Sequence, residues 1–204
     1  MNSSLRVTLN ASPEQLRGLV ALQAAFAQVC NALVPLVQQT RCWNRVTLHH
    51  LAYKSLREQF PHIGSQMVCN AIYSVSRTSR LVFQHPASPF HLSRLDGKPL
   101  PTLRFLDTSP VYFDRHTLSV KAGTLSMYTL DGRMRFLLSL SEADEKNFHE
   151  NKLREIVLSR KANGAFELRF WFSDAQDEEA GANAVASMRQ HTQIPEYVKV
   201  EAAA

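Results

Sequence analysis

Glycine and cysteine are both scarce in this chain, whose 204 residues include seven glycines and three cysteines. So few glycines leave little room for a loop whose backbone amides cradle a phosphate, and no glycine-rich phosphate motif is present. The odd number of cysteines cannot form a complete disulfide framework, and the lack of any C-x-x-C pair argues against a zinc knuckle. We therefore expect Cys30, Cys42 and Cys69 to be reduced thiols and the protein to be cytoplasmic. We also expect neither a metal nor a cofactor.

Long apolar runs are also lacking. No run approaches the ~20 residues that a membrane span needs, and the first residues show no charged region followed by an apolar stretch. We expect neither contact with a membrane nor a signal peptide.

The motifs of common catalytic centres are missing as well. The sequence has no G-x-S-x-G elbow and no H-x-x-x-H pair, and the adjacent His49 and His50 would point about 100° apart on a helix, which hinders binding to one metal. Asp107 and Asp114 flank the start of the predicted β region, and a small Mg²⁺-dependent nuclease built on them is an alternative that their spacing does not demand. We expect no complete catalytic centre and interpret the chain as a non-enzyme.

Acidic residues are scarce in the first half only. Residues 1–104 contain 11 Lys and Arg against 3 Asp and Glu, whereas residues 105–204 contain 12 against 15. A basic half joined to a nearly neutral half is typical of an electrostatic footprint for phosphates. The alternative is a solvated basic face without a partner.

The order of the predicted elements indicates an α+β fold. Residues 4–9 alternate apolar and polar side chains like a half-buried strand, and Ser12 with Gln15 forms a capping box at a helix start. Pro35 is expected to kink or end that first helix. The helices are expected at about residues 12–39, 46–59 and 65–82.

The second half is expected to form antiparallel strands. Asp131-Gly132 is a strong hairpin turn between residues 124–130 and 133–140, and Lys161–Gly164 joins residues 155–160 to 165–172. Ser141 is a plausible cap for a short acidic helix or loop that reaches residue 150.

The lone N-terminal strand must satisfy its backbone groups by pairing with these later hairpins. We therefore expect a β-barrel-like domain with an inserted helical segment, followed by a weakly ordered tail. The predicted parts are residues 1–11 (first barrel strand), 12–100 (inserted basic helical lobe), 101–173 (remaining barrel) and 174–204 (acidic, alanine-rich tail).

Basic and aromatic residues alternate in the helical segment. Arginine forks grip phosphates and aromatic rings stack on unpaired bases, a combination suited to RNA, although a place in the core is the usual role of any single aromatic residue. The third helix carries a polar stripe with steps of four and three residues that no apolar residue interrupts. The candidate contacts are Arg41, Trp43, Arg45, Lys54 and Arg57, with Gln66, Asn70, Tyr73, Arg77 and Arg80 in the stripe.

Several stretches resemble TnpB proteins, the transposon-encoded RNA-guided nucleases related to type V CRISPR effectors. Residues 51–66 and 69–77 resemble the recognition-lobe helices of that family, and residues 117–121, 125–135 and 152–172 resemble its wedge domain. The likeness covers roughly residues 4–173.

The resemblance implies a wedge barrel split by a helical recognition lobe. It also implies that Lys54, Arg57, Tyr73, Arg77, Arg80 and Lys121 lie near guide RNA or the guide–target duplex. The family continues into a RuvC nuclease domain, whereas Phe172-Ser-Asp174 leads here into an acidic, alanine-rich segment. Cleavage is therefore not implied.

These observations favour an RNA-binding, nuclease-lacking protein that holds a guide-like RNA, alone or together with target DNA. It would be a repressor, a targeting subunit or part of a split effector with a separate nuclease chain. The alternative is a protein-interaction subunit of a larger assembly that makes no contact with nucleic acid.

Overall fold

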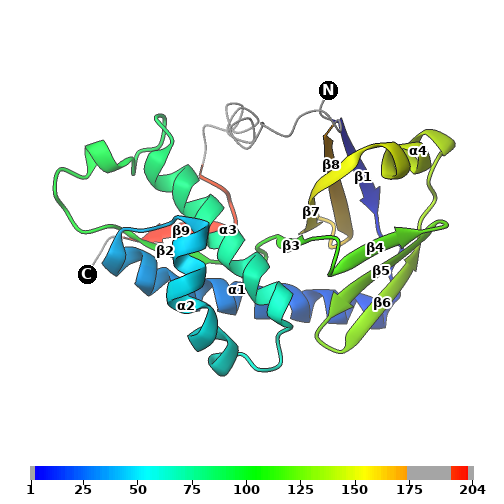
Figure 1. The fold of residues 1–204 in the computed structure, drawn as a ribbon, viewed down its shortest axis with the longest axis horizontal. Coiled ribbons are helices and arrows are strands. Elements are labelled where there is room, and N and C mark those ends of the chain that lie inside the picture. The colour runs from blue at the N-terminus through cyan, green and yellow to red at the C-terminus, as the bar shows by residue number, and fades with distance from the viewer. Residues whose placement is uncertain (1–2, 174–193, 202–204) are drawn as a thin grey trace. The chain divides into compact units, whose positions relative to one another are not determined.

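A computed structural model describes residues 3–173 and 194–201, which form four α-helices, one short 3₁₀ helix and nine strands (Figure 1). The α+β class expected from the sequence is confirmed, and every strand pair is antiparallel. The strands form sheets of four, two and three strands, and none of these closes into a barrel within the described residues. The barrel expectation was wrong for this part of the chain, because no backbone ladder joins one sheet to the next.

The chain divides into two compact units, both discontinuous in sequence. Unit 1 contains residues 1–23 and 110–180, and unit 2 contains residues 24–109 and 181–204. Helix α1 (Pro13–Thr40) contributes residues to both.

The larger sheet of unit 1 has the strand order β1-β8-β7-β3. The N-terminal strand pairs along its whole length with β8, as the sequence predicted, and Leu5 lies opposite Phe170. Leu168, Phe170 and Phe172 are buried on one face of this sheet, which is the core side of the unit. The strands are β1 (Ser3–Thr8), β3 (Val111–Phe113), β7 (Lys152–Arg160) and β8 (Phe166–Ser173).

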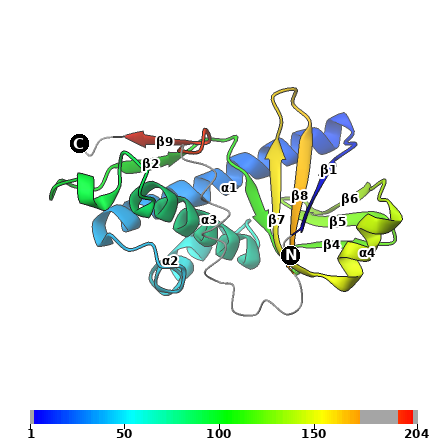
Figure 2. The same cartoon turned by 90° about the horizontal axis from the view of Figure 1, so that it is seen from above.

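The smaller sheet of unit 1 is a three-stranded meander whose strands run side by side in Figure 2. The predicted hairpin is confirmed, but its two-residue turn is Leu130-Asp131 and not Asp131-Gly132, because Gly132 pairs with Thr129 as the first residue of β6. Gly132 adopts a φ of 102°, a conformation that few other residues tolerate. Leu118, Leu125 and Phe136 are buried. The strands are β4 (Leu118–Lys121), β5 (Thr124–Thr129) and β6 (Gly132–Leu137).

Helix α4 (Glu142–Glu150) starts with a capping box in which Ser141 and Asp144 satisfy each other's backbone amides. The predicted cap at Ser141 is confirmed. The half-buried Phe148 of this helix packs against the core, where its ring and the rings of Phe170 and Phe172 are in edge-to-face contact at centroid distances of 5.0 and 5.1 Å.

Helix α1 begins with the predicted capping box. The Ser12 amide donates to Gln15 Oε1 at 2.9 Å, and the Gln15 amide donates to Ser12 Oγ at 3.2 Å. Of the two outcomes expected at Pro35, a kink or an end of the helix, the end is excluded, since α1 continues to Thr40. The buried Leu33, Val34 and Val37 hold the chain in place on both sides of the proline.

By length and composition, α1 is also able to cross a membrane. The sequence contains no unbroken apolar run here, because Gln23, Gln28 and Asn31 interrupt the apolar residues of this helix. More than half of this stretch is buried inside the protein, and core helices of globular proteins and signal sequences have the same properties. The helix is therefore weak evidence for a membrane.

Unit 2 is built on the helical hairpin of α2 (Arg45–Gln59) and α3 (Ser65–Gln84). Asn44 caps α2, because its side-chain oxygen accepts from the Val46 amide at 3.0 Å and from the Thr47 amide at 3.2 Å. Cys30 on α1 donates to the Ala71 carbonyl of α3 at 3.8 Å. A 3₁₀ helix, η1 (Leu92–Arg94), lies in the connector that follows α3.

A two-stranded sheet of β2 (Thr102–Phe105) and β9 (Val198–Glu201) completes unit 2 (Figure 2). The expectation of a weakly ordered tail was wrong for residues 198–201, because β2 supplies a backbone partner that the local sequence does not reveal. Residues 174–193 of that predicted tail lie outside the described residues.

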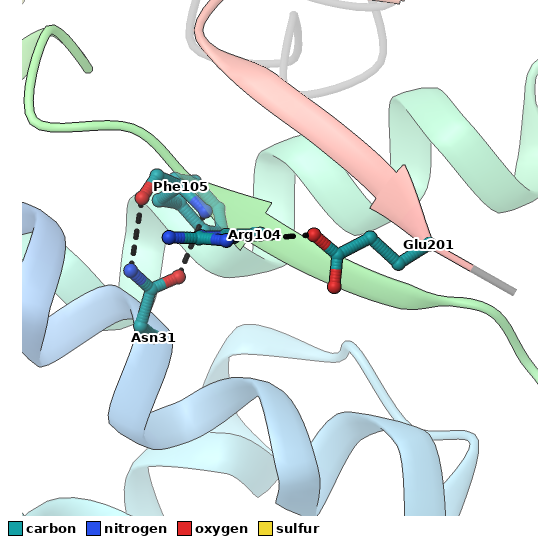
Figure 3. A network of polar contacts seen from close by, with 4 residues as sticks. All are labelled: Asn31, Arg104, Phe105 and Glu201. Carbon is teal, nitrogen blue, oxygen red and sulfur yellow. Dashed lines mark hydrogen bonds and ion pairs between the residues drawn. The ribbon is translucent and has the colours of Figure 1, made fainter. Parts of the chain in front are cut away.

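The edge of β2 that faces away from β9 forms hydrogen bonds with a side chain of α1 (Figure 3). Asn31 Nδ2 donates to the Phe105 carbonyl at 2.9 Å, and the Phe105 amide donates to Asn31 Oδ1 at 2.8 Å. On the same strand, Arg104 forms an exposed ion pair with Glu201 at 3.7 Å. One asparagine thus satisfies both backbone groups of a buried residue.

We expect Asn31→Ala to lower the free energy of unfolding by at least ~2 kcal/mol, because an unpaired buried backbone group costs roughly 1–3 kcal/mol. Urea denaturation measures this change. The matched control is Arg104→Ala, which removes only an exposed ion pair and should cost less than about 1 kcal/mol. Equal effects of the two substitutions would show that the Asn31 amide does not anchor β2.

Candidate nucleic-acid interface on helices α2 and α3

Two rows of side chains at intervals of four residues meet where α2 packs on α3. The row on α2 contains Arg45, His49 and Tyr53, and the row on α3 contains Tyr73 and Arg77. The His49 and Tyr53 rings stack with a centroid distance of 4.6 Å and an interplanar angle of 17°. Residues four apart share one side of a helix, so each row presents a continuous line of side chains.

A cluster of two arginines and one tyrosine joins the two rows. Arg45 Cζ lies 5.2 Å from the centroid of the Tyr73 ring, a cation–π contact between α2 and α3. Arg77 Nη1 donates to the Tyr73 hydroxyl at 3.2 Å. We call this group the Arg45–Tyr73–Arg77 cluster.

The start of α2 is held against the middle of α3, which brings Arg45 to Tyr73. The Ser76 hydroxyl donates to the Trp43 carbonyl at 2.6 Å, and the Trp43 and Phe83 rings are 5.5 Å apart. The Asn44 cap then sets the first turn of α2 directly after this anchor. Backbone anchoring therefore places the guanidinium group, without relying on an ion pair.

Two of the predicted contacts serve the fold. The Arg57 guanidinium donates to the Ile63 carbonyl and ties α2 to the loop before α3. Arg41, which adopts a φ of 50° directly after α1, donates to the Lys98 carbonyl at 2.7 Å. Lys54 and Arg80 are exposed and form no hydrogen bond or ion pair with the described residues. These two side chains are therefore available to a ligand.

Two predicted contacts must be withdrawn because their side chains are buried. Trp43 is 6% exposed and Asn70 is 5% exposed, so neither presents a ring or an amide to solvent. Twelve of the twenty residues of α3 are buried, and its polar stripe is therefore narrower than the sequence suggested. Gln66, Tyr73 and Arg77 remain half-buried on this stripe.

Lys121 is exposed at the end of β4 and belongs to unit 1. The other predicted contacts belong to unit 2.

His49 is a member of the surface that sequence reasoning missed. The adjacent histidines were considered only as metal ligands, but the spacing of Arg45, His49 and Tyr53 already placed them in one helical row. That spacing was the available signal.

Asp107 and Asp114, considered for a metal-dependent nuclease, fall in different units. Asp114 Oδ1 accepts from the amides of His116 and Thr117 at 2.9 and 3.0 Å, which shapes the turn before β4. The described residues contain no group of three potential metal ligands from His, Cys, Asp and Glu.

The three cysteines are free, and only Cys30 is buried, while Cys42 and Cys69 are half-buried. Burial raises the pKa of the Cys30 thiol far above its ordinary range, so this group is a neutral thiol at physiological pH.

No protein-family model matches this chain, and no curated protein matches it.

We expect Trp43→Phe to leave RNA affinity within about twofold of the parent protein, because the ring lies in the core. Trp43→Ala should lower the free energy of unfolding by roughly 3–5 kcal/mol. RNA titrations and urea denaturation of both variants measure the two effects. A tenfold loss of affinity in Trp43→Phe at unchanged stability would place the ring in the interface instead.

Proposed function

We propose that this chain binds RNA through the Arg45–Tyr73–Arg77 cluster and the exposed cations of the same two helices. The observation that carries the proposal is the cluster itself, in which two helices place two guanidinium groups around one tyrosine ring. Guanidinium groups bind phosphate in a forked geometry, and an adjacent aromatic surface suits unpaired bases.

The charge of the surrounding segment supports this proposal. Residues 24–109 contain nine Lys and Arg against three Asp and Glu. Such an excess of positive charge attracts a polyanion before any specific contact forms. Lys54, on α2, and Arg80, on α3, extend this excess along the two helices that form the cluster.

We further propose that the chain corresponds to the wedge and recognition lobe of TnpB-like proteins. In this proposal unit 2 holds a guide-like RNA, and unit 1 is the counterpart of the wedge, with Lys121 near the RNA. Support comes from the sequence resemblance and from the helical segment between two parts of unit 1. The protein would act in the cytoplasm as a non-catalytic binder that also engages target DNA, and a separate chain would supply any cleavage.

A second candidate function is a protein-interaction subunit. Val46 and Leu51 are 63% and 53% exposed on α2, and exposed apolar side chains on a helix are common in protein interfaces. In that case the basic residues would contact an acidic protein surface.

The double variant Arg45→Glu with Arg80→Glu tests the RNA proposal. We expect RNA affinity at moderate salt to fall about tenfold per arginine, since a hydrogen bond to a charged group contributes roughly 1.5–3 kcal/mol. The plot of log affinity against log salt should also become shallower by about 0.7 per lost phosphate contact. Fluorescence anisotropy with labelled single-stranded RNA measures both quantities.

The matched control is Arg115→Glu with Lys146→Glu, which changes the net charge equally at two exposed positions of unit 1. This control should lose much less affinity and keep the parent salt dependence. Equal losses in the two double variants would reduce the effect to net charge and would reject the α2–α3 site.

The guide-like nature of the RNA has its own test. We expect the purified protein to carry RNA whose sequencing reveals one constant end. A protein free of nucleobase absorbance that instead co-purifies with a stoichiometric protein partner would favour the second candidate function.

A further inference from the structure

The larger sheet of unit 1 has a second face, opposite its apolar core. Leu168 and Phe170 are buried, so the alternating residues Glu167, Arg169 and Trp171 of β8 lie on the other side of the sheet. Arg6 of β1 lies on this same side, because it is directly opposite Arg169 in the antiparallel register. We call this surface the outer face of the sheet.

The outer face holds two like charges in direct opposition. Like charges at opposite positions of neighbouring strands destabilise a sheet. Neither Arg6 nor Arg169 forms a hydrogen bond or an ion pair with the described residues, although each guanidinium has five N–H donors. Burial lowers the pKa of Arg169 most, and the positive charge of Arg6 lowers it further, whereas the negative charges of Glu167 and Glu155 raise it.

The carboxylates of the outer face do not neutralise the two arginines directly. Glu167 forms an ion pair with Lys161 at 2.8 Å, and Lys161 also donates to Thr8 Oγ1 at 2.9 Å. Glu155 lies opposite Trp171, one pair of positions away from the two arginines. Among the described residues, the arginine pair therefore has no directly bonded anion that would offset its repulsion.

An aromatic ring lies beside this pair. Arg169 Cζ is 5.7 Å from the centroid of the Trp171 ring, and the indole is half-buried. Guanidinium groups next to a flat aromatic surface match a nucleotide, whose phosphate is anionic and whose base stacks on indole.

We propose that Arg6 and Arg169 bind the phosphate of a nucleotide whose base stacks on Trp171. The ligand is a nucleoside phosphate, either free or within a single RNA strand. This site consists of residues of unit 1 and does not require that the α2–α3 surface of unit 2 bind RNA. A nucleotide bound here would convert a destabilising pair into a stabilising one.

Trp171 fluorescence reports binding directly. The chain contains two tryptophans, and Trp43 is buried in unit 2, so a ligand that stacks on the surface should quench only the Trp171 signal. We expect saturable quenching when the full chain, freed of RNA, is titrated with adenosine monophosphate or a short oligoadenylate. Trp171→Phe should abolish the quenching. Quenching by the monophosphate would identify a site for free nucleotides, and quenching by the oligomer alone would identify an RNA site.

Arg6→Thr and Arg169→Gln should each weaken this binding at least tenfold, whereas Arg115→Gln and the double variant Arg45→Glu with Arg80→Glu should leave it within twofold. Without ligand, Arg6→Thr should raise the melting temperature, because threonine suits a strand and removes the repulsion. No saturable quenching by either probe would overturn the proposal. Unchanged binding in both arginine variants would also overturn it, because the arginine pair would then have no role in binding. A lower melting temperature for Arg6→Thr would overturn it as well, because the pair would then stabilise the sheet without a ligand.

Discussion

The pairing of β1 with β8 is the constraint on which the arrangement of the chain depends. A strand of six residues at the N-terminus cannot satisfy its backbone groups alone, and its partner lies more than 150 residues away in the sequence. The helical segment that follows β1 must leave this sheet before β3, β7 and β8 can complete it. A contact of this sequence separation is slow to form, because loop-closure entropy must be overcome before the strand gains its hydrogen bonds. The helical segment packs with β2 and β9 into a compact unit that has its own buried residues.

Unit 2 also contains a pair of strands that are far apart in the sequence. Strand β9 returns from the far end of the chain to pair with β2, and Asn31 satisfies the opposite edge of β2. A two-stranded sheet has only marginal stability in isolation. The Asn31 amide stabilises this one because it forms the two hydrogen bonds with Phe105 that a third strand would otherwise form. The same polar residue interrupts the apolar sequence of α1. A residue that weakens the apolar pattern of the helix is thus the one that joins the helix to the sheet.

The sequence predicted those elements whose signals are local. Alternation marked β1 and β8, Asp131-Gly132 marked one hairpin, and Ser12 and Ser141 marked two helix starts. It did not predict β9, because four alternating residues have no meaning without β2. Nor did it predict which side chains of α3 are exposed. A helix that packs on more than one side buries polar positions too, so the helical period alone could not reveal that Asn70 is inside the protein. The contact of Arg45 with Tyr73 depends on how α2 packs on α3. The sequence pattern predicts which side chains share one side of each helix, but it does not predict that these two sides are in contact.

Both proposed surfaces lie where local rules of stability are broken. On α3 the Asn70 amide nitrogen and the Ser79 hydroxyl are buried and find no hydrogen-bond partner among the described residues, and on the outer face Arg6 opposes Arg169. In natural proteins, local preferences, core packing and polar pairing usually favour the same structure, and exceptions are expected at functional sites. Each unpaired polar group or opposed charge lowers stability, and apolar packing must offset this loss. In unit 1 the offset is visible in the row of buried phenylalanines on β8, directly behind the arginine pair. The strand that carries Arg169 on the outer face thus buries apolar side chains on its other face, and this burial offsets the cost of opposing Arg6 and Arg169.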